Sequence, residues 1–189
     1  MLTQQQLWAG RLGRGASLVV FVATLLWSPV HTFAQSTGET ERHSSFLADV
    51  TKRVVLDPTT YAPALIGYDS TMRDWNSSQP FFRNGFVEHN ARFTISGRPD
   101  DMALAYGVGR RRILSDALVT LETSAVNNIT DSIFERVLAE RYPNHRRLIR
   151  VMGWIEKGTF ASYMSYRLSA AHYRQWQQNE AMSRQLGLR

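Results

Sequence analysis

Apolar residues recur every three or four positions along most of the chain from Ser44 onward, which is the spacing of one face of an α-helix. The pattern predicts an all-α fold, an irregular bundle of four or five helices in a single domain over residues 44–189. The first helix is expected to run from Ser44 to about Leu56. Asp57 and Pro58 then begin a second, because Asp accepts hydrogen bonds from free N–H groups and Pro suits the first helical turn.

The second helix is expected to break near Trp75. Residues 76–78 are Asn-Ser-Ser, whose side chains compete for backbone hydrogen bonds, and Pro80 disfavours helix at the residue before it. A shorter helix then runs from Pro80 to about Glu88. Residues 93–99 are expected to be extended or looped, and a short strand there would have no obvious partner.

Two long helical stretches follow. Asp100 or Asp101 is expected to cap the first, which kinks or divides at residues 127–128, because adjacent asparagines are poor helix formers, and which ends before Tyr142. The second runs over residues 145–185. Since globular helices rarely exceed about 20 residues, its C-terminal end is expected to project from the domain.

The N-terminus has the pattern of a signal peptide over residues 1–34. Arg11 and Arg14 precede an uncharged, mostly apolar run over residues 16–26, and small residues at the positions that a signal peptidase requires end at Ala34. An uncleaved anchor is the alternative, although the apolar run is shorter than the ~20 residues of a spanning helix. Either reading predicts export to the periplasm or cell envelope.

Residues 35–43 are mostly small, polar or charged, which predicts a flexible tether. The chain has 22 Lys and Arg against 16 Asp and Glu, and removing the two arginines of the signal segment lowers the formal charge from +6 to +4. So small an excess, with both signs interspersed, argues against a nucleic-acid-binding protein. The absence of cysteine excludes disulfides and thiolate zinc sites.

Groups capable of chemistry are densest over residues 66–94. The candidates there are Asp69 and the run Glu88, His89 and Asn90, because a carboxylate beside an imidazole can transfer protons or bind a metal. Adjacent residues of a helix point about 100° apart, so Glu88 and His89 could not both face one ion from a helix. The Glu-x-x-His spacing of carboxylate-bridged metal sites is also absent. We therefore predict no metal and no cofactor.

His172 and Asn179 share one side of the last predicted helix. His172 could meet Glu88 or Asp69 across the bundle and form a histidine–carboxylate pair. A hydrogen-bonded interior histidine is the commoner role, and Asp69 and Glu88 are likewise expected to be structural anchors first.

The chain resembles a family of small uncharacterised bacterial helical membrane proteins in three motifs: Asp69-Ser70-Thr71, Gly85-x-x-Glu88-x-Asn90, and a Ser/Ala-rich last helix with His172 and Asn179. The resemblance covers about residues 65–179, and Ala91 stands where the family has proline. The family brings no activity with it. It implies a single site made of Asp69, Glu88, Asn90 and His172.

No Gly-x-Ser-x-Gly elbow, His-Glu-x-x-His motif or phosphate-binding glycine loop is present in the sequence. We therefore expect a non-enzymatic exported protein that binds an envelope protein or an anionic membrane surface through its Arg-rich, aromatic face. One alternative is a hydrolase or metal-dependent enzyme centred on Glu88, His89 and His172. The other is a membrane-embedded protein spanning with residues 148–171, although the charges in that segment are costly in a bilayer.

Overall fold

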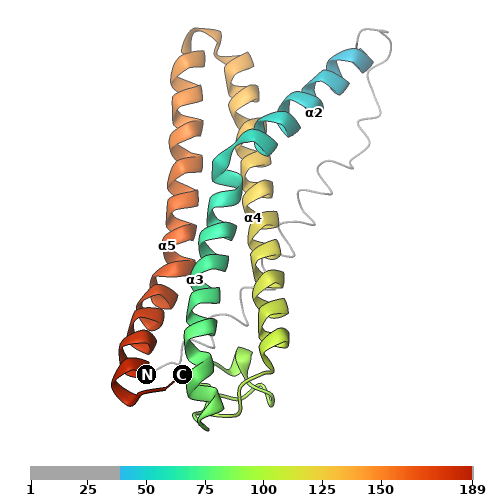
Figure 1. Ribbon diagram of the computed structural model, residues 1–189. Coiled ribbons are helices and arrows are strands. Elements are labelled where there is room, and N and C mark those ends of the chain that lie inside the picture. Colours follow the sequence, from blue (N-terminus) through green and yellow to red (C-terminus); the bar gives the residue numbers. More distant parts are fainter. Residues whose placement is uncertain (1–38, 189) are drawn as a thin grey trace. The chain divides into compact units, whose positions relative to one another are not determined.

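The protein is described by a computed structural model over residues 39–188, so the predicted signal peptide and the start of the tether lie outside the described residues. The described part forms four α-helices and two short 3-10 helices, and no strand. They are α2 (Glu39–Leu56), α3 (Pro58–Arg83), η1 (Ala91–Phe93), α4 (Tyr106–Arg141), η2 (Pro143–His145) and α5 (Arg146–Leu186). Helices α3, α4 and α5 pack side by side (Figure 1). The predicted all-α bundle is confirmed.

The first two helices meet at the predicted boundary. Helix α2 begins at Glu39 rather than Ser44, so the last residues of the predicted tether are helical, in keeping with the helix propensity of Glu and Arg. Helix α3 begins as expected, with Pro58 in its first turn and the Asp57 carboxylate accepting a hydrogen bond of 3.0 Å from the Thr59 N–H.

The predicted break near Trp75 is wrong, because α3 continues without interruption through Pro80. The hydroxyls of Ser77 and Ser78 each donate a 2.9 Å hydrogen bond to the Asp74 carbonyl, one turn earlier in the helix. These side chains therefore bond back onto the helix and do not unwind it. Pro80 removes a single N–H, and packing against α5 holds the helix together across that gap.

The helix predicted to reach Glu88 ends at Arg83, and Glu88 lies in the loop that follows. Its N–H donates to the Asp101 carbonyl at 2.8 Å, and the Asp101 N–H returns a bond at 3.3 Å. A second bridge joins Thr94 to Ala103. The predicted extended segment, residues 93–99, therefore has a partner, contrary to expectation. It pairs through Thr94 with the part of the chain that leads into α4.

The predicted cap of α4 is also wrong. The helix starts at Tyr106, after an Ala105 that makes no side-chain cap. Asp101 instead holds the loop, since its carboxylate accepts hydrogen bonds from the N–H groups of Ser96 at 3.3 Å and Met102 at 2.7 Å. With this carboxylate used in the loop, the first turn of α4 has no side-chain acceptor.

Helix α4 does not divide at its adjacent asparagines. Asn128 is 1% exposed and donates to the hydroxyls of Thr59 and Thr60, at 2.9 and 2.7 Å, which ties the middle of α4 to the start of α3. These tertiary hydrogen bonds therefore offset the low helix propensity of asparagine. The apolar core lies at the other end of α3, where Trp75 packs against Phe93 and Ile113.

Helix α5 runs within one residue of its predicted bounds. It stays against α3 as far as Asn179, which is buried and hydrogen-bonded to that helix, and it closes at Gly187 in the left-handed conformation (φ 66°). Among residues 39–188, no helix combines the length and apolar character needed to cross a membrane.

Candidate functional site

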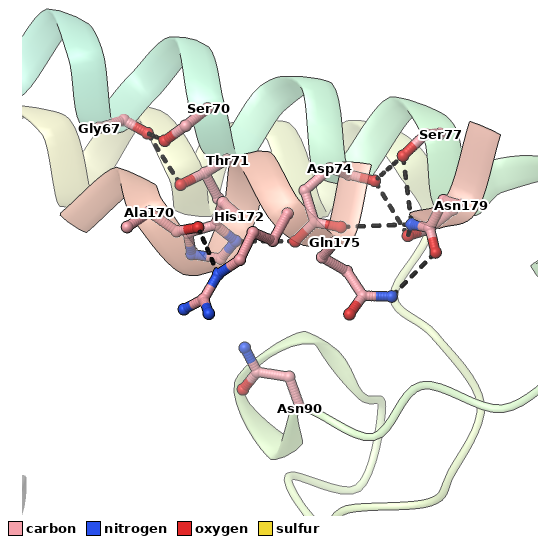
Figure 2. A network of polar contacts seen from close by, with 12 residues as sticks. Gly67, Ser70, Thr71, Asp74, Ser77, Asn90, Ala170, His172, Gln175 and Asn179 are labelled. Atoms are coloured by element: carbon pink, nitrogen blue, oxygen red, sulfur yellow. Dashed lines mark hydrogen bonds and ion pairs between the residues drawn. The ribbon is translucent and has the colours of Figure 1, made fainter. Parts of the chain in front are cut away.

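A polar network joins the C-terminal halves of α3 and α5 (Figure 2). His172 of α5 lies with Nδ1 2.7 Å from the Oδ2 of Asp74 on α3, and the Asp74 carboxylate is largely buried. His172 was expected to meet Glu88 or Asp69. It meets Asp74 instead, one and a half turns beyond Asp69 along the same helix.

Asn179 completes the network two turns further along α5, on the side of the helix that also carries His172. Its Nδ2 approaches three acceptors of α3: the Asp74 Oδ1 at 3.3 Å and the hydroxyls of Ser77 and Ser78 at 3.2 and 2.9 Å. The Gln175 Nε2 donates to the side-chain oxygen of Asn179, Oδ1, at 2.9 Å. Asp74 is therefore held in one position by two side chains of the opposite helix.

A cavity of about 440 Å³ opens beside this network, between α3, α5 and the loop after α3. Figure 2 shows Asn90 on that loop, across the open space from His172 and Gln175, with no bond to the network. The polar lining comprises Thr71, Asp74, Ser78, Glu88, His89, Asn90, His172, Gln175 and Asn179. The aromatic lining comprises Trp75, Phe81, Phe82, Phe86 and Phe93.

Glu88 is the second carboxylate of the cavity. Burial raises the pKa of Glu88 above the ordinary range of glutamate, and the negative charge of Asp74 raises it further. A hydrogen bond of 2.7 Å from the Asn90 N–H to Glu88 Oε1 acts in the opposite direction without cancelling the shift. Glu88 therefore keeps its proton to a higher pH than a solvated glutamate does.

Two of the predicted site residues have other roles. Asp69 does not line the cavity. Its Oδ2 instead accepts hydrogen bonds of 2.8 Å from Arg73 and from the Tyr173 hydroxyl. The hydrogen bond from Arg73, together with that from Tyr173, lowers the pKa of the Asp69 carboxyl. Because Tyr173 is on α5, its bond to Asp69 also anchors α3 to α5. His89 lies mostly exposed at the cavity's edge and pairs with Asp100.

The structure thus places Glu88, Asn90, His172 and Asn179 around one cavity, with His89 at its edge, and leaves Asp69 out. The residue that sequence reasoning undervalued is Asp74, which is the centre of the network. Its signal was present, because Asp74, Ser77 and Ser78 have i, i+3 and i+4 spacing and share a face of an unbroken helix. The assumed break before Pro80 hid that face.

The described residues contain no group of three or more His, Asp or Glu side chains that could hold a metal ion. What the arrangement offers is a positioned carboxylate, a second carboxylate in the opposite loop, and five aromatic side chains that line the same cavity. Comparison of the chain with protein-family models, with characterised proteins and with solved structures found no match.

Proposed function

We propose that this protein is a non-enzymatic binding protein of the cell envelope, and that its cavity holds a small organic cation with an apolar body. The observation that carries the proposal is the composition of the cavity, which joins two carboxylates to five aromatic side chains. No Arg or Lys lines it among the described residues. Its volume lies within the ~300–1,000 Å³ typical of small-molecule sites.

The charge at Asp74 favours a cationic ligand. Its two hydrogen-bond partners within the network are an imidazole and a carboxamide, and neither is a permanent cation. A carboxylate offers about four acceptor sites, so Asp74 can still accept hydrogen bonds from a bound ammonium group. Ionised Glu88 would add a second negative charge.

The aromatic lining favours the same ligand. Trp75 packs between Phe82 and Phe93, with ring centroids 5.6 and 5.3 Å away, so this wall is formed by the core itself. Aromatic faces attract cations and cover apolar groups at the same time. Because Asp74 and Trp75 are both held in place by the surrounding packing, binding requires little ordering of the site.

The envelope location rests on the signal-peptide pattern of residues 1–34 and is part of the proposal. Intact mass of the chain purified from its host's envelope fraction tests it. Cleavage after Ala34 is the expected result, and a full-length chain recovered only from the cytosolic fraction would contradict the location.

Isothermal titration calorimetry with three matched probes tests the ligand class. The protein is titrated with 2-phenylethylamine, which is cationic at neutral pH, with neutral 2-phenylethanol and with anionic 3-phenylpropionate. The amine is expected to bind most tightly and the carboxylate least. Equal affinity for all three, or preference for the carboxylate, would overturn the proposal.

Two isosteric variants locate the interaction. Asp74→Asn removes one of the two carboxylates of the cavity, whereas Asp69→Asn removes a carboxylate of the same helix that does not line it. Hydrogen bonds to charged groups contribute about 1.5–3 kcal/mol, so Asp74→Asn should weaken amine binding roughly 10- to 150-fold. Asp69→Asn should leave the affinity unchanged, and equal losses in both variants would place the ligand elsewhere.

The 2.7 Å contact between His172 and Asp74 favours a second candidate, a hydrolase in which His172 acts as general base. With Nδ1 facing Asp74, its Nε2 would accept the proton of an attacking water. Turnover of p-nitrophenyl acetate compares the unmodified chain with His172→Gln. Hydrolysis that depends on His172 would favour the enzyme, and equal background rates would remove this candidate.

A further inference from the structure

The outer side of α5 exposes apolar residues that a helix of a water-soluble bundle would bury. Four of them, each more than half exposed, follow one another at i, i+3, i+4 and i+7: Leu148, Val151, Met152 and Ile155. Tyr163 and Tyr166 continue the stripe, and they are also more than half exposed. We call these six residues the outer face of α5.

The opposite side of α5 is small and polar. Lys157, Ala161 and Ser169 are buried there, and the Lys157 ammonium group donates to the hydroxyl of Ser132 at 2.8 Å. Helices at the surface of soluble bundles place their apolar stripe inward and their polar residues outward. Helix α5 has the reverse arrangement, which indicates that its outer face is covered by something apolar.

Basic side chains border the outer face. Arg147 is exposed at its start and Arg167 at its end, while Arg141 and Arg146 lie exposed at the turn between α4 and α5. Arg150 is exposed too, but it faces α4, with its Nε 3.9 Å from the Glu135 Oε1. Exposed acids are fewer, with Glu140 near the turn and Glu156 beside the stripe. An apolar, aromatic stripe with flanking arginines fits the boundary between acyl chains and negatively charged headgroups.

We propose that the outer face of α5 docks on a membrane surface rich in anionic phospholipid, with the helix parallel to the membrane plane. An interfacial helix buries its apolar side about 5–10 Å into the headgroup and acyl boundary. Between Leu148 and Tyr166 the stripe extends roughly 27 Å at 1.5 Å per residue, which gives a long shallow contact.

Charge disfavours a second copy of the chain as the occupant. An antiparallel α5–α5 contact centred on Lys157 would bring Arg147 of one copy opposite Arg167 of the other, and a parallel contact would place Arg147 opposite Arg147. Like charges at such an interface are destabilising. Anionic headgroups neutralise them. This inference does not depend on the ligand proposed for the cavity.

The absence of cysteine makes a site-specific test possible. A single cysteine is introduced in the full chain, either as Ile155→Cys on the outer face or as Leu65→Cys on α3, which is 65% exposed. Each is labelled with an environment-sensitive fluorophore. The probes are vesicles of phosphatidylcholine alone and vesicles of equal parts phosphatidylcholine and phosphatidylglycerol.

The label at residue 155 should shift to the blue with the anionic vesicles only, and the shift should decrease as salt is added, because screening weakens attraction between exposed charges. The label at residue 65 should not shift. Equal shifts at both positions, or none at residue 155, would overturn the inference.

A charge variant separates the membrane from a second copy. Met152→Glu combined with Ile155→Glu places two carboxylates on the outer face at exposed positions, and circular dichroism verifies that the chain stays folded. Flotation with anionic vesicles should fall at least several-fold, whereas Leu65→Glu should float like the unmodified chain. Light scattering that shows a dimer split by the double variant, with no vesicle binding by the unmodified chain, would assign the face to self-association instead.

Discussion

Replacing Gly109 by alanine tests the packing that supports the cavity wall. Gly109 is buried in the first turns of α4, where the Trp75 indole lies directly against its backbone. A methyl group at residue 109 would lie 2.5 Å from the indole Cε2 and 3.0 Å from Nε1. The ring cannot retreat easily, because it is 4% exposed, packs between Phe82 and Phe93, and donates from Nε1 to the Tyr106 carbonyl at 3.3 Å.

Two opposing effects set the magnitude. Alanine is favoured over glycine in a helix by about 0.8–1 kcal/mol, whereas overpacking a core typically costs about 1–3 kcal/mol. A control with the first effect alone is Gly158→Ala, since Gly158 is inside α5 and a Cβ there meets nothing within 4 Å. The free energy of unfolding of Gly109→Ala should therefore lie about 1–3 kcal/mol below that of Gly158→Ala.

Urea unfolding followed by circular dichroism measures both variants under the same conditions, so the propensity gain cancels in their difference. Gly109→Ala should also weaken binding of 2-phenylethylamine, because the displaced indole lines the cavity. If the two variants were equally stable, the close approach of Trp75 to α4 would be refuted, and with it the rigid aromatic wall.

The remaining predictions concern buried polar groups. Because burial raises the pKa of Glu88, the folded chain binds this proton more tightly than the unfolded chain. The stability that Glu88 contributes is therefore fully present below the pKa of this residue in the unfolded chain. It is lost as the pH rises through the pKa of Glu88 in the folded chain. Urea unfolding across this pH range should show a smaller decrease in the free energy of unfolding for Glu88→Gln than for the unmodified chain or the exposed control Glu122→Gln. Identical profiles would argue against burial of Glu88. Asn128→Ala should cost about 1–3 kcal/mol in the same assay because two threonine hydroxyls lose a buried donor, and a cost no larger than that of Asn127→Ala would count against the link between α3 and α4.

The helices could be predicted from the sequence because their signals are local. The 3.6-residue periodicity and the Asp57 cap identify the elements and the boundary between α2 and α3. The break near Trp75 could not be judged in this way. Whether Ser77 and Ser78 unwind a helix or bond back onto it depends on the helix packed alongside, and that contact joins residues about 100 positions apart.

The candidate site shows the same division between local and long-range information. That His172 and Asn179 share a side of α5 follows from spacing, and the structure directs both to one carboxylate. Which carboxylate they meet depends on the register between α3 and α5, which periodicity does not specify. The approach of Glu88 to the cavity depends on the bridge between residues 88 and 101 in a loop that was expected to be partly helical.

Whether the cavity binds a small cation against its aromatic wall can be measured by NMR. A titration with 2-phenylethylamine follows the indole N–H resonances of the ¹⁵N-labelled chain. Trp75 lines the cavity, whereas Trp154 is 72% exposed on α5 and Trp176 makes an edge-on contact with Tyr173 outside it. If the amine binds in the cavity, the Trp75 resonance moves in a saturable way while those of Trp154 and Trp176 stay in place. A Trp75 resonance that does not move, or equal movement of all three, would contradict binding in the cavity.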